Sequence, residues 1–263
     1  MSPGRARSGP RPKRTAANEP VRALTSDVWY TLLYLHASDQ VRLDLARVRI
    51  WSSPLVRAGR SRKEAIRAVR ALESWAAAAE GEGWTPTIPV QAEHLTERTG
   101  VPLDPVEIAD RLDALVDRFP IRVAPGAIAA LARLNEAGLR LGLVSNLLHE
   151  TGEGLRRLLS QVGLLPFFSC AILSSEHPWS KPRPEPFRAA VRALGRRPGE
   201  AAHVGDLTYD VLGARRAGLW PILYTGLHRY EPARLDGLTR ITDRNLKRVA
   251  RWADLPDLLT PRH

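Results

Sequence analysis

The chain has 263 residues, of which 44% are hydrophobic and 25% are charged, a balance typical of a globular protein with a sizeable core. Its one cysteine, Cys170, excludes an internal disulfide, and no cluster of cysteine and histidine indicates a zinc site. We therefore expect a protein of a reducing compartment, the cytoplasm.

Residues 1–20 combine five basic residues with several prolines and one acid. This composition buries too little apolar surface to fold alone, so we predict a disordered basic tail. The segment lacks the apolar stretch of a secretory signal, and no later run reaches the roughly 18 apolar residues of a membrane span. No membrane association is expected.

The net charge of +11 raises the question of nucleic-acid binding. The basic residues are scattered along the chain and form no stripe interleaved with aromatic residues. Only four of the 39 basic residues are lysines, namely Lys13, Lys63, Lys181 and Lys247, which indicates a compositional bias toward arginine. We expect no nucleic-acid partner.

The first strongly apolar run, "RALTSDVWYTLLYL", predicts a short buried strand that ends near Asp27 and is followed by a turn. Residues 36–120 then show helical spacing. One helix is predicted in "SRKEAIRAVRALESWAAAAEGEG", and another follows Asp104, which precedes a proline as an N-cap residue often does. No strong strand pattern interrupts this block, which predicts an all-helical insert.

From residue 121 onward, strands and helices alternate. Buried strands are predicted in "LRLGLVSN", "FFSCAILSS", "AAHVGD" and "WPILYTG", with helices between them. Such alternation implies right-handed crossovers and a parallel sheet covered on both faces. We therefore predict an α/β fold, a Rossmann-like doubly wound parallel sheet formed by residues 21–35 and 121–263, with the helical residues 36–120 inserted after its first strand.

Polar residues follow most of the predicted strands, at the carboxyl edge of the sheet where ligands bind in open α/β folds. Each has an ordinary explanation when taken alone, as a turn residue, a helix N-cap, a first-turn acid or a solvated lysine. Their convergence at one edge indicates a site instead. The candidates are Asp27, Ser145, Asn146, Lys181, Asp206 and Asp210.

The acids among these candidates predict a metal ion. Three carboxylates at one sheet edge repel one another unless a cation lies among them, and oxygen ligands of this kind suit Mg²⁺. Such an ion neutralises a phosphate as it approaches an anionic nucleophile, and Lys181 can neutralise the transferring oxygens from the other side. Asp27 is then a plausible nucleophile toward a small anionic substrate.

The order and spacing of these residues resemble the haloacid dehalogenase superfamily of hydrolases. "DVWYTLL" resembles the first motif of that family, DxDxT, with Asp27 in the nucleophile position and Thr31 in the threonine position. "LVSN" resembles the second motif, which implies that Ser145 binds substrate oxygens and that Asn146 lies beside it in the substrate site.

The other two motifs lie further along the chain. "SKPRPEPF" resembles the third motif through Lys181, and "HVGDLTYDVLGARRAG" resembles the fourth, which implies that Asp206 and Asp210 hold the metal. The resemblance also implies that residues 36–120 form a cap that closes over the site and selects the substrate. Three arginines of this cap either face an anionic substrate or lie on its surface, namely Arg57, Arg60 and Arg62.

Trp29 departs from the family pattern. The resembling phosphatases carry at this position an aspartate that protonates the leaving alcohol and later activates water. An indole can do neither, because its N–H only donates. The family uses the backbone carbonyl of this residue as a metal ligand, so the resemblance still implies that Trp29 contributes to the metal site.

Three functions remain open on these observations. A Mg²⁺-dependent phosphatase is favoured, with His36 or His177 as candidate substitutes for the missing acid. A 2-haloacid dehalogenase needs no proton on its leaving halide and carries an aromatic residue at the position of Trp29, but the two acids Asp206 and Asp210 argue against it. The third reading is a weakly active binding or regulatory protein. Neither the physiological substrate nor the oligomeric state is predicted.

Overall fold

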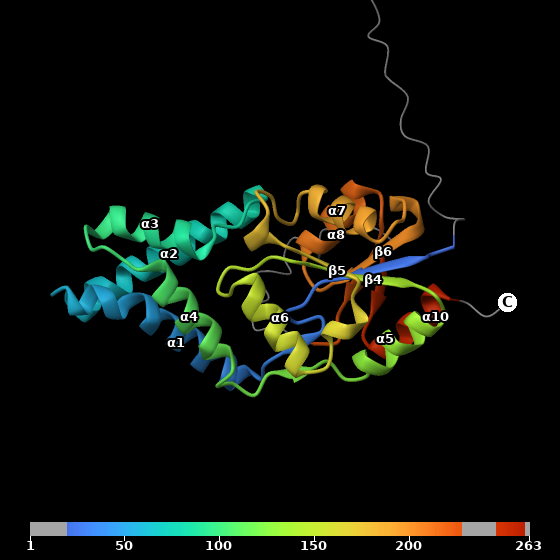
Figure 1. The fold of residues 1–263 in the computed structure, drawn as a ribbon, viewed down its shortest axis with the longest axis horizontal. Helices are drawn as coiled ribbons and strands as arrows, with labels where there is room; N and C mark the ends of the chain where they lie inside the picture. The colour runs from blue at the N-terminus through green and yellow to red at the C-terminus, as the bar shows by residue number, and fades with distance from the viewer. Residues whose placement is uncertain (1–19, 228–245, 261–263) are drawn as a thin grey trace, which may run out of the picture.

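A six-stranded parallel sheet lies at the centre of the computed structural model, which describes residues 20–227 and 246–260 (Figure 1). The strand order is β5-β4-β1-β6-β7-β8, and every neighbouring pair is parallel. The strands are β1 (Ala23–Ser26), β4 (Arg140–Ser145), β5 (Cys170–Leu173), β6 (Ala201–Gly205), β7 (Trp220–Tyr224) and β8 (Lys247–Val249). The predicted basic tail, apart from Pro20, lies outside the described residues.

Helices cover both faces of this sheet, as the alternating pattern predicts. Successive strand residues point to opposite faces, so Leu24 packs with α5, α6 and α10, whereas Ala23 packs with α7 and α8. The helices are α5 (Ala127–Glu136), α6 (Gly152–Gln161), α7 (Glu185–Ala193), α8 (Thr208–Ala217) and α10 (Leu255–Leu259), and the short 3-10 turns are η1 (Leu165–Phe167), η2 (Ser174–Glu176), η3 (Pro198–Glu200) and η4 (Trp252–Asp254). The predicted doubly wound α/β class is confirmed.

Four helices follow the first strand and form the helical insert, residues 37–116, at one end of the molecule (Figure 1). They are α1 (Ala37–Arg57), α2 (Arg62–Glu82), α3 (Ile88–Thr99) and α4 (Pro105–Val116). Two short antiparallel strands, β2 (Leu33–Tyr34) and β3 (Arg122–Val123), flank the insert and join its two connections to the sheet. Two-residue strands carry no period-2 signal, so the sequence did not predict them.

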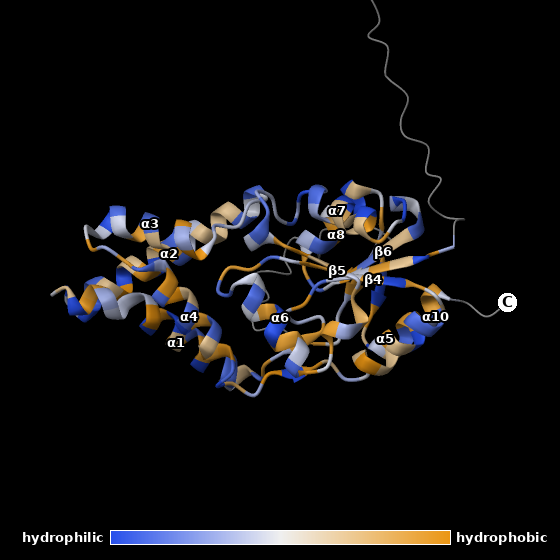
Figure 2. Ribbon diagram, viewed as in Figure 1, coloured by the Kyte–Doolittle hydropathy of each residue, from blue (hydrophilic) through white to orange (hydrophobic). Residues whose placement is uncertain are grey.

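The insert has an apolar core of its own, and its helices carry charged residues on their other faces (Figure 2). Their ends follow the predicted signals. Ser61 and Glu64 form a capping box at the start of α2, which ends at Gly83 with a φ of +89°. The Asp104 carboxylate accepts hydrogen bonds from two backbone amides at the start of α4, which confirms it as the N-cap.

Membrane-spanning candidates are absent from the described helices, since none of them combines the necessary length with the necessary hydrophobicity. The longest, α1 and α2, have 21 residues each. Both instead bury one apolar stripe in the core of the insert.

Candidate active site at the carboxyl edge of the sheet

The carboxyl ends of β1, β4 and β6 lie side by side, because Ser26 pairs with both Leu143 and Val204. Asp27 leaves β1 at this point, and its amide donates a hydrogen bond of 2.9 Å to the Val204 carbonyl. Ser145 ends β4, two residues beyond Leu143. The parallel register therefore brings together side chains that are more than a hundred residues apart in the chain.

Lys181 is the centre of the charged cluster. Its Nζ lies 2.5 Å from Asp27 Oδ1 and 2.7 Å from Asp210 Oδ1. All three side chains are buried, with residue exposures of 3%, 5% and 0% respectively. The structure thus brings together one cation and two carboxylates in a region from which water is largely excluded, where charge interactions are strong.

Asn146 fixes the loop that carries Lys181. Its Nδ2 donates to the Lys181 carbonyl at 3.1 Å, and its Oδ1 accepts from the Lys181 amide at 3.0 Å. Both polar groups of the amide side chain are therefore engaged by the protein backbone. Contact of Asn146 with substrate stays a prediction, whereas its hold on Lys181 is what the structure shows.

Burial and charge pairing set the protonation states of the cluster. Burial alone lowers the pKa of Lys181, but Asp210 and Asp27 outweigh it and raise that pKa above its usual value. Burial raises the pKa of Asp210, but Lys181 and His203 outweigh it and bring that pKa well below its usual range. Lysine and aspartate are therefore both charged at neutral pH.

His203 is a member of the cluster that the sequence did not single out. Its Nε2 lies 3.1 Å from Asp210 Oδ1, and its Nδ1 lies 2.8 Å from the Thr25 hydroxyl. Burial lowers the pKa of His203, and this effect exceeds the opposing influence of Asp210. A titratable residue inside the buried strand "AAHVGD" is the signal that could identify it, but the apolar pattern of this strand predicts burial alone.

Two hydroxyl groups flank Asp27. Ser145 Oγ lies 3.4 Å from Asp27 Oδ1, and Thr31 Oγ1 lies 3.5 Å from both Asp27 Oδ2 and Asp206 Oδ1. These distances are at the long end for hydrogen bonds, so each is weak. Both hydroxyl groups therefore lie beside the candidate nucleophile. Their contact with substrate stays a prediction.

The three acids of the site suit a divalent metal. Asp27, Asp206 and Asp210 are all buried, and each offers a carboxylate oxygen such that these atoms lie within 4.8 Å of one another. Several carboxylate oxygens at such spacing match the ligand preference of hard divalent cations. Metal ligation by the Trp29 carbonyl stays a prediction.

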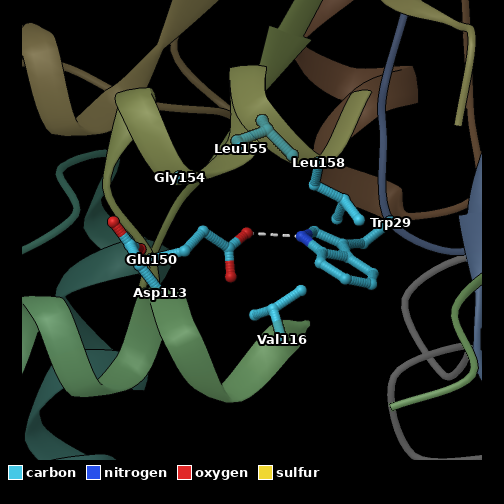
Figure 3. A pocket seen from close by; sticks show the side chains of 7 residues that line it. All are labelled: Trp29, Asp113, Val116, Glu150, Gly154, Leu155 and Leu158. Carbon is cyan, nitrogen blue, oxygen red and sulfur yellow. Dashed lines mark hydrogen bonds between the residues drawn. The ribbon is translucent and has the colours of Figure 1, made fainter. Parts of the chain in front are cut away.

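The Trp29 side chain points toward Glu150, which lies in the loop before α6 (Figure 3). The indole Nε1–H donates a hydrogen bond to Glu150 Oε1, and Arg47 Nη2 of α1 lies 3.7 Å from Glu150 Oε2. Burial raises the pKa of Glu150, although Arg47 and Trp29 oppose that effect. Asp113 of α4 lies beside this group. No sequence pattern predicts the contacts of Glu150 and Arg47.

The other polar candidates lie apart from the cluster. The His36 ring contacts Tyr34, and the His177 ring stacks on Trp179. In the described part of the chain neither histidine has a hydrogen bond to Asp27 or Lys181. Two of the three insert arginines are bound within the insert, Arg57 by Glu107 and Arg60 by the Thr99 carbonyl, which supports the surface interpretation.

Neutral hydrogen bonds also join the insert to the rest of the molecule, and two of them involve loops at the carboxyl edge of the sheet. Gln91 Nε2 of α3 donates to the Leu148 carbonyl at 2.8 Å, next to the loop that holds Glu150. The Ser180 amide donates to the Gly83 carbonyl at 2.9 Å, at the end of α2. The insert therefore touches the loops that carry Asn146 and Lys181.

Comparison with known proteins gives a consistent picture. The pattern of the family described as haloacid dehalogenase-like hydrolase matches residues 26–218. Phosphoglycolate phosphatase of Caulobacter vibrioides is 32% identical over 139 residues, which are 51% of this chain and 57% of that protein. Glyceraldehyde 3-phosphate phosphatase of Methanopyrus kandleri is 38% identical over 129 residues, which are 48% of this chain and 54% of that protein. The chain thus spans about half the length of these curated relatives.

Solved structures share the fold over nearly the whole chain. A HAD phosphatase from Thermococcus onnurineus has a TM-score of 0.63 and 21% identity, covering 91% of this chain and 98% of that one. A 2-haloacid dehalogenase from Pseudomonas syringae pv. Tomato has a TM-score of 0.62 and 21% identity, with the same coverage. At such identity the likeness concerns the fold alone, and phosphatase and dehalogenase fit equally well.

Proposed function

The chain belongs to the haloacid dehalogenase-like hydrolase family, and from that premise we propose that it is a Mg²⁺-dependent phosphatase acting on a small phosphorylated substrate. The observation that carries the proposal is the buried contact of Lys181 with both Asp27 and Asp210. An ammonium beside Asp27 supports the role of Asp27 as a nucleophile toward an anionic substrate. The names of the curated relatives support the same class of substrate. The cytoplasm, which suits a chain with one free cysteine, is the location that the proposal implies.

Asp27 attacks the phosphorus of the substrate, the bond from phosphorus to the leaving-group oxygen breaks, and that oxygen departs as an anion. Water then hydrolyses the aspartyl phosphate and releases inorganic phosphate. Lys181, Ser145 and Thr31 bind the phosphoryl oxygens, and Asn146 keeps the Lys181 loop in place. The carboxylates of Asp27, Asp206 and Asp210 would hold the metal, together with the Trp29 carbonyl that the resemblance to the family implies. When bound there, Mg²⁺ neutralises the carboxylates and the phosphoryl group.

Trp29 restricts the substrates that this mechanism serves. Loss of a general acid typically costs about 10²- to 10⁴-fold in rate, because the leaving alkoxide must then depart without a proton. A leaving group that is stable as an anion, such as the carboxylate of an acyl phosphate or the phenolate of an aryl phosphate, needs that proton less. Such substrates are therefore expected to react faster than simple alkyl phosphates.

A dehalogenase is the second candidate, and Trp29 is the observation that favours it. A halide leaves without a proton, so an indole at this position does not slow dehalogenation through loss of a general acid. The two buried acids Asp206 and Asp210 weigh against it, because two further negative charges beside Asp27 oppose the approach of a carboxylate substrate unless a cation is bound. The phosphatase is therefore ranked first.

One panel of assays separates the two reactions. We expect hydrolysis of an aryl phosphate, an acyl phosphate and members of a phosphorylated-metabolite panel with Mg²⁺, and none with EDTA. The Asp27→Asn variant should lose the activity, whereas Asp257→Asn, which changes an exposed acid on α10, should keep it. Metal-independent release of halide from 2-chloropropionate would identify a dehalogenase, and an unaffected Asp27→Asn variant would refute the nucleophile assignment.

A further inference from the structure

Glu150 links its own loop to two segments that lie about a hundred residues earlier in the chain. Its carboxylate accepts from the indole of Trp29, which lies in the loop that carries Asp27, and it pairs with the guanidinium of Arg47 on α1 of the insert (Figure 3). The side chains of Arg47 and Glu150 are only 11% and 6% exposed. One buried carboxylate thus bridges the nucleophile loop and the helical insert.

The charges around Glu150 make this bridge specific. Burial raises the pKa of its carboxyl, Arg47 and Trp29 act in the opposite direction, and the nearby acids Asp113 and Asp27 reinforce the effect of burial. Within the described residues, Arg47 and the indole are the donors that offset the burial of this carboxylate. A buried carboxylate that loses either donor is left poorly solvated, so the two contacts support each other.

Asp113 has a different set of partners. Its carboxylate accepts from both the amide and the hydroxyl of Thr151, at 2.9 and 2.5 Å. This contact fastens α4 to the start of α6 and does not involve the nucleophile loop. The Glu150 bridge is therefore separate from this fastening. It ties α1 to Trp29, next to Tyr30, whose hydroxyl donates to Gln40 Oε1 of the same helix.

We propose that Glu150 is a positioning residue that holds the helical insert over the site by bridging Arg47 and Trp29. The proposal rests on the proposed function insofar as the insert covers a substrate site. With the bridge intact, the insert stays docked and the substrate binds to a site that is already assembled. Without it, the docked state is populated less, and apparent substrate affinity falls by the same fraction.

The Ser180 amide reports docking without any need for activity. It donates across the interface to the Gly83 carbonyl of the insert, whereas the adjacent Lys181 amide donates to Asn146 within the sheet domain. Amide hydrogen exchange at Ser180 therefore measures undocking of the insert. The Lys181 amide serves as the internal reference.

Three variants test the bridge. Arg47→Met removes the guanidinium, Glu150→Gln removes the charge but keeps an oxygen that accepts from the indole, and Trp29→Phe removes the N–H but keeps an aromatic ring. Glu153→Gln, an exposed acid in the first turn of α6, is the matched control.

The first two variants should speed exchange at Ser180 about tenfold and raise KM about five- to tenfold, with kcat within about twofold, because saturating substrate restores the docked state. In a double-mutant cycle, Arg47→Met and Trp29→Phe should be coupled in the parent chain and uncoupled in the Glu150→Gln background. Glu153→Gln should resemble the parent.

Unchanged exchange at Ser180 and unchanged KM in Glu150→Gln would overturn the proposal, as would a fall in kcat with constant KM. Glu150→Ala gives a larger effect if it folds, and Glu150→Gln remains the decisive variant if it does not. Should the chain show no hydrolytic activity at all, the proposed function fails while the exchange data still decide whether Glu150 docks the insert.

Discussion

Replacing Lys181 by methionine tests the electrostatics of the site directly. The substitution keeps an apolar side chain of similar length and removes the ammonium that lies 2.5 and 2.7 Å from two buried carboxylates. Breaking a buried ion pair by removing one partner typically costs about 3–5 kcal/mol, because an uncompensated charge stays behind. We expect the free energy of unfolding of Lys181→Met, measured by urea denaturation with EDTA at pH 7, to fall by about that amount.

Mg²⁺ and pH should each reduce this loss. A cation at a hundred times its Kd stabilises the folded state by about 2.7 kcal/mol, and the gain should be larger in the variant, where no ammonium competes for Asp27 and Asp210. The pKa of Asp210 is depressed in the parent, so its contribution to stability is present above the usual pKa of an aspartate and is lost as the pH falls below it. In the variant, acid instead neutralises the orphaned carboxylates. The difference between the two proteins should therefore shrink as the pH falls.

Exposed Lys63 on α2 provides the control, since Lys63→Met should change the free energy of unfolding by less than about 0.5 kcal/mol. Equal stability of Lys181→Met and Lys63→Met in EDTA would refute the assignment of Lys181 as the counter-charge of the site. A loss that Mg²⁺ does not reduce would refute the metal site while leaving the ion pair intact.

Three further predictions concern local structure. Burial raises the pKa of Cys170 to about 11, so only about one thiol in a thousand is ionised at pH 8. Iodoacetamide should therefore alkylate Cys170 far more slowly than a free cysteine. The alkylation rate should still rise about tenfold per pH unit above pH 8. Asp104→Ala should cost about 1 kcal/mol in urea denaturation through loss of the helix cap, whereas Asp110→Ala, an exposed mid-helix change in the same element, should cost nothing. Gly59 and Gly83 both have a φ of +89°, so replacing either by alanine should lower the free energy of unfolding by about 1 kcal/mol or more. The loss should be larger for Gly83→Ala, because the new Cβ would lie 2.3 Å from an arginine side chain.

Much of the site could be predicted because the information is local. A short buried run followed by a polar residue specifies a strand and its carboxyl end, and parallel pairing then places Asp27, Ser145 and Asp206 at one edge. Lys181 was conspicuous because lysine is rare in this chain. Each of these inferences needs only the pattern within ten or so residues and the topology of a doubly wound sheet.

The contacts of the insert could not be predicted in this way. Trp29 and Glu150 are 121 residues apart, and Glu150 reads in the sequence as an ordinary acid before a helix. Its burial depends on how α1 and α4 pack against the loops of the sheet, which is a matter of tertiary structure. The short pair β2 and β3 is similar, since Leu33 and Val123 pair with each other although the whole insert separates them in the chain.

The structure also explains why a tryptophan is tolerated at the position where resembling phosphatases carry an aspartate. A side chain that leaves the nucleophile loop in the direction of Trp29 meets a buried carboxylate, that of Glu150. An aspartate at this position would add a further negative charge near the buried Glu150 carboxylate and would offer it no hydrogen-bond donor. An indole N–H is a donor without charge, and it satisfies the carboxylate that an acid would repel. Trp29 and Glu150 therefore form one unit, through which the nucleophile loop is connected to Arg47 of the insert.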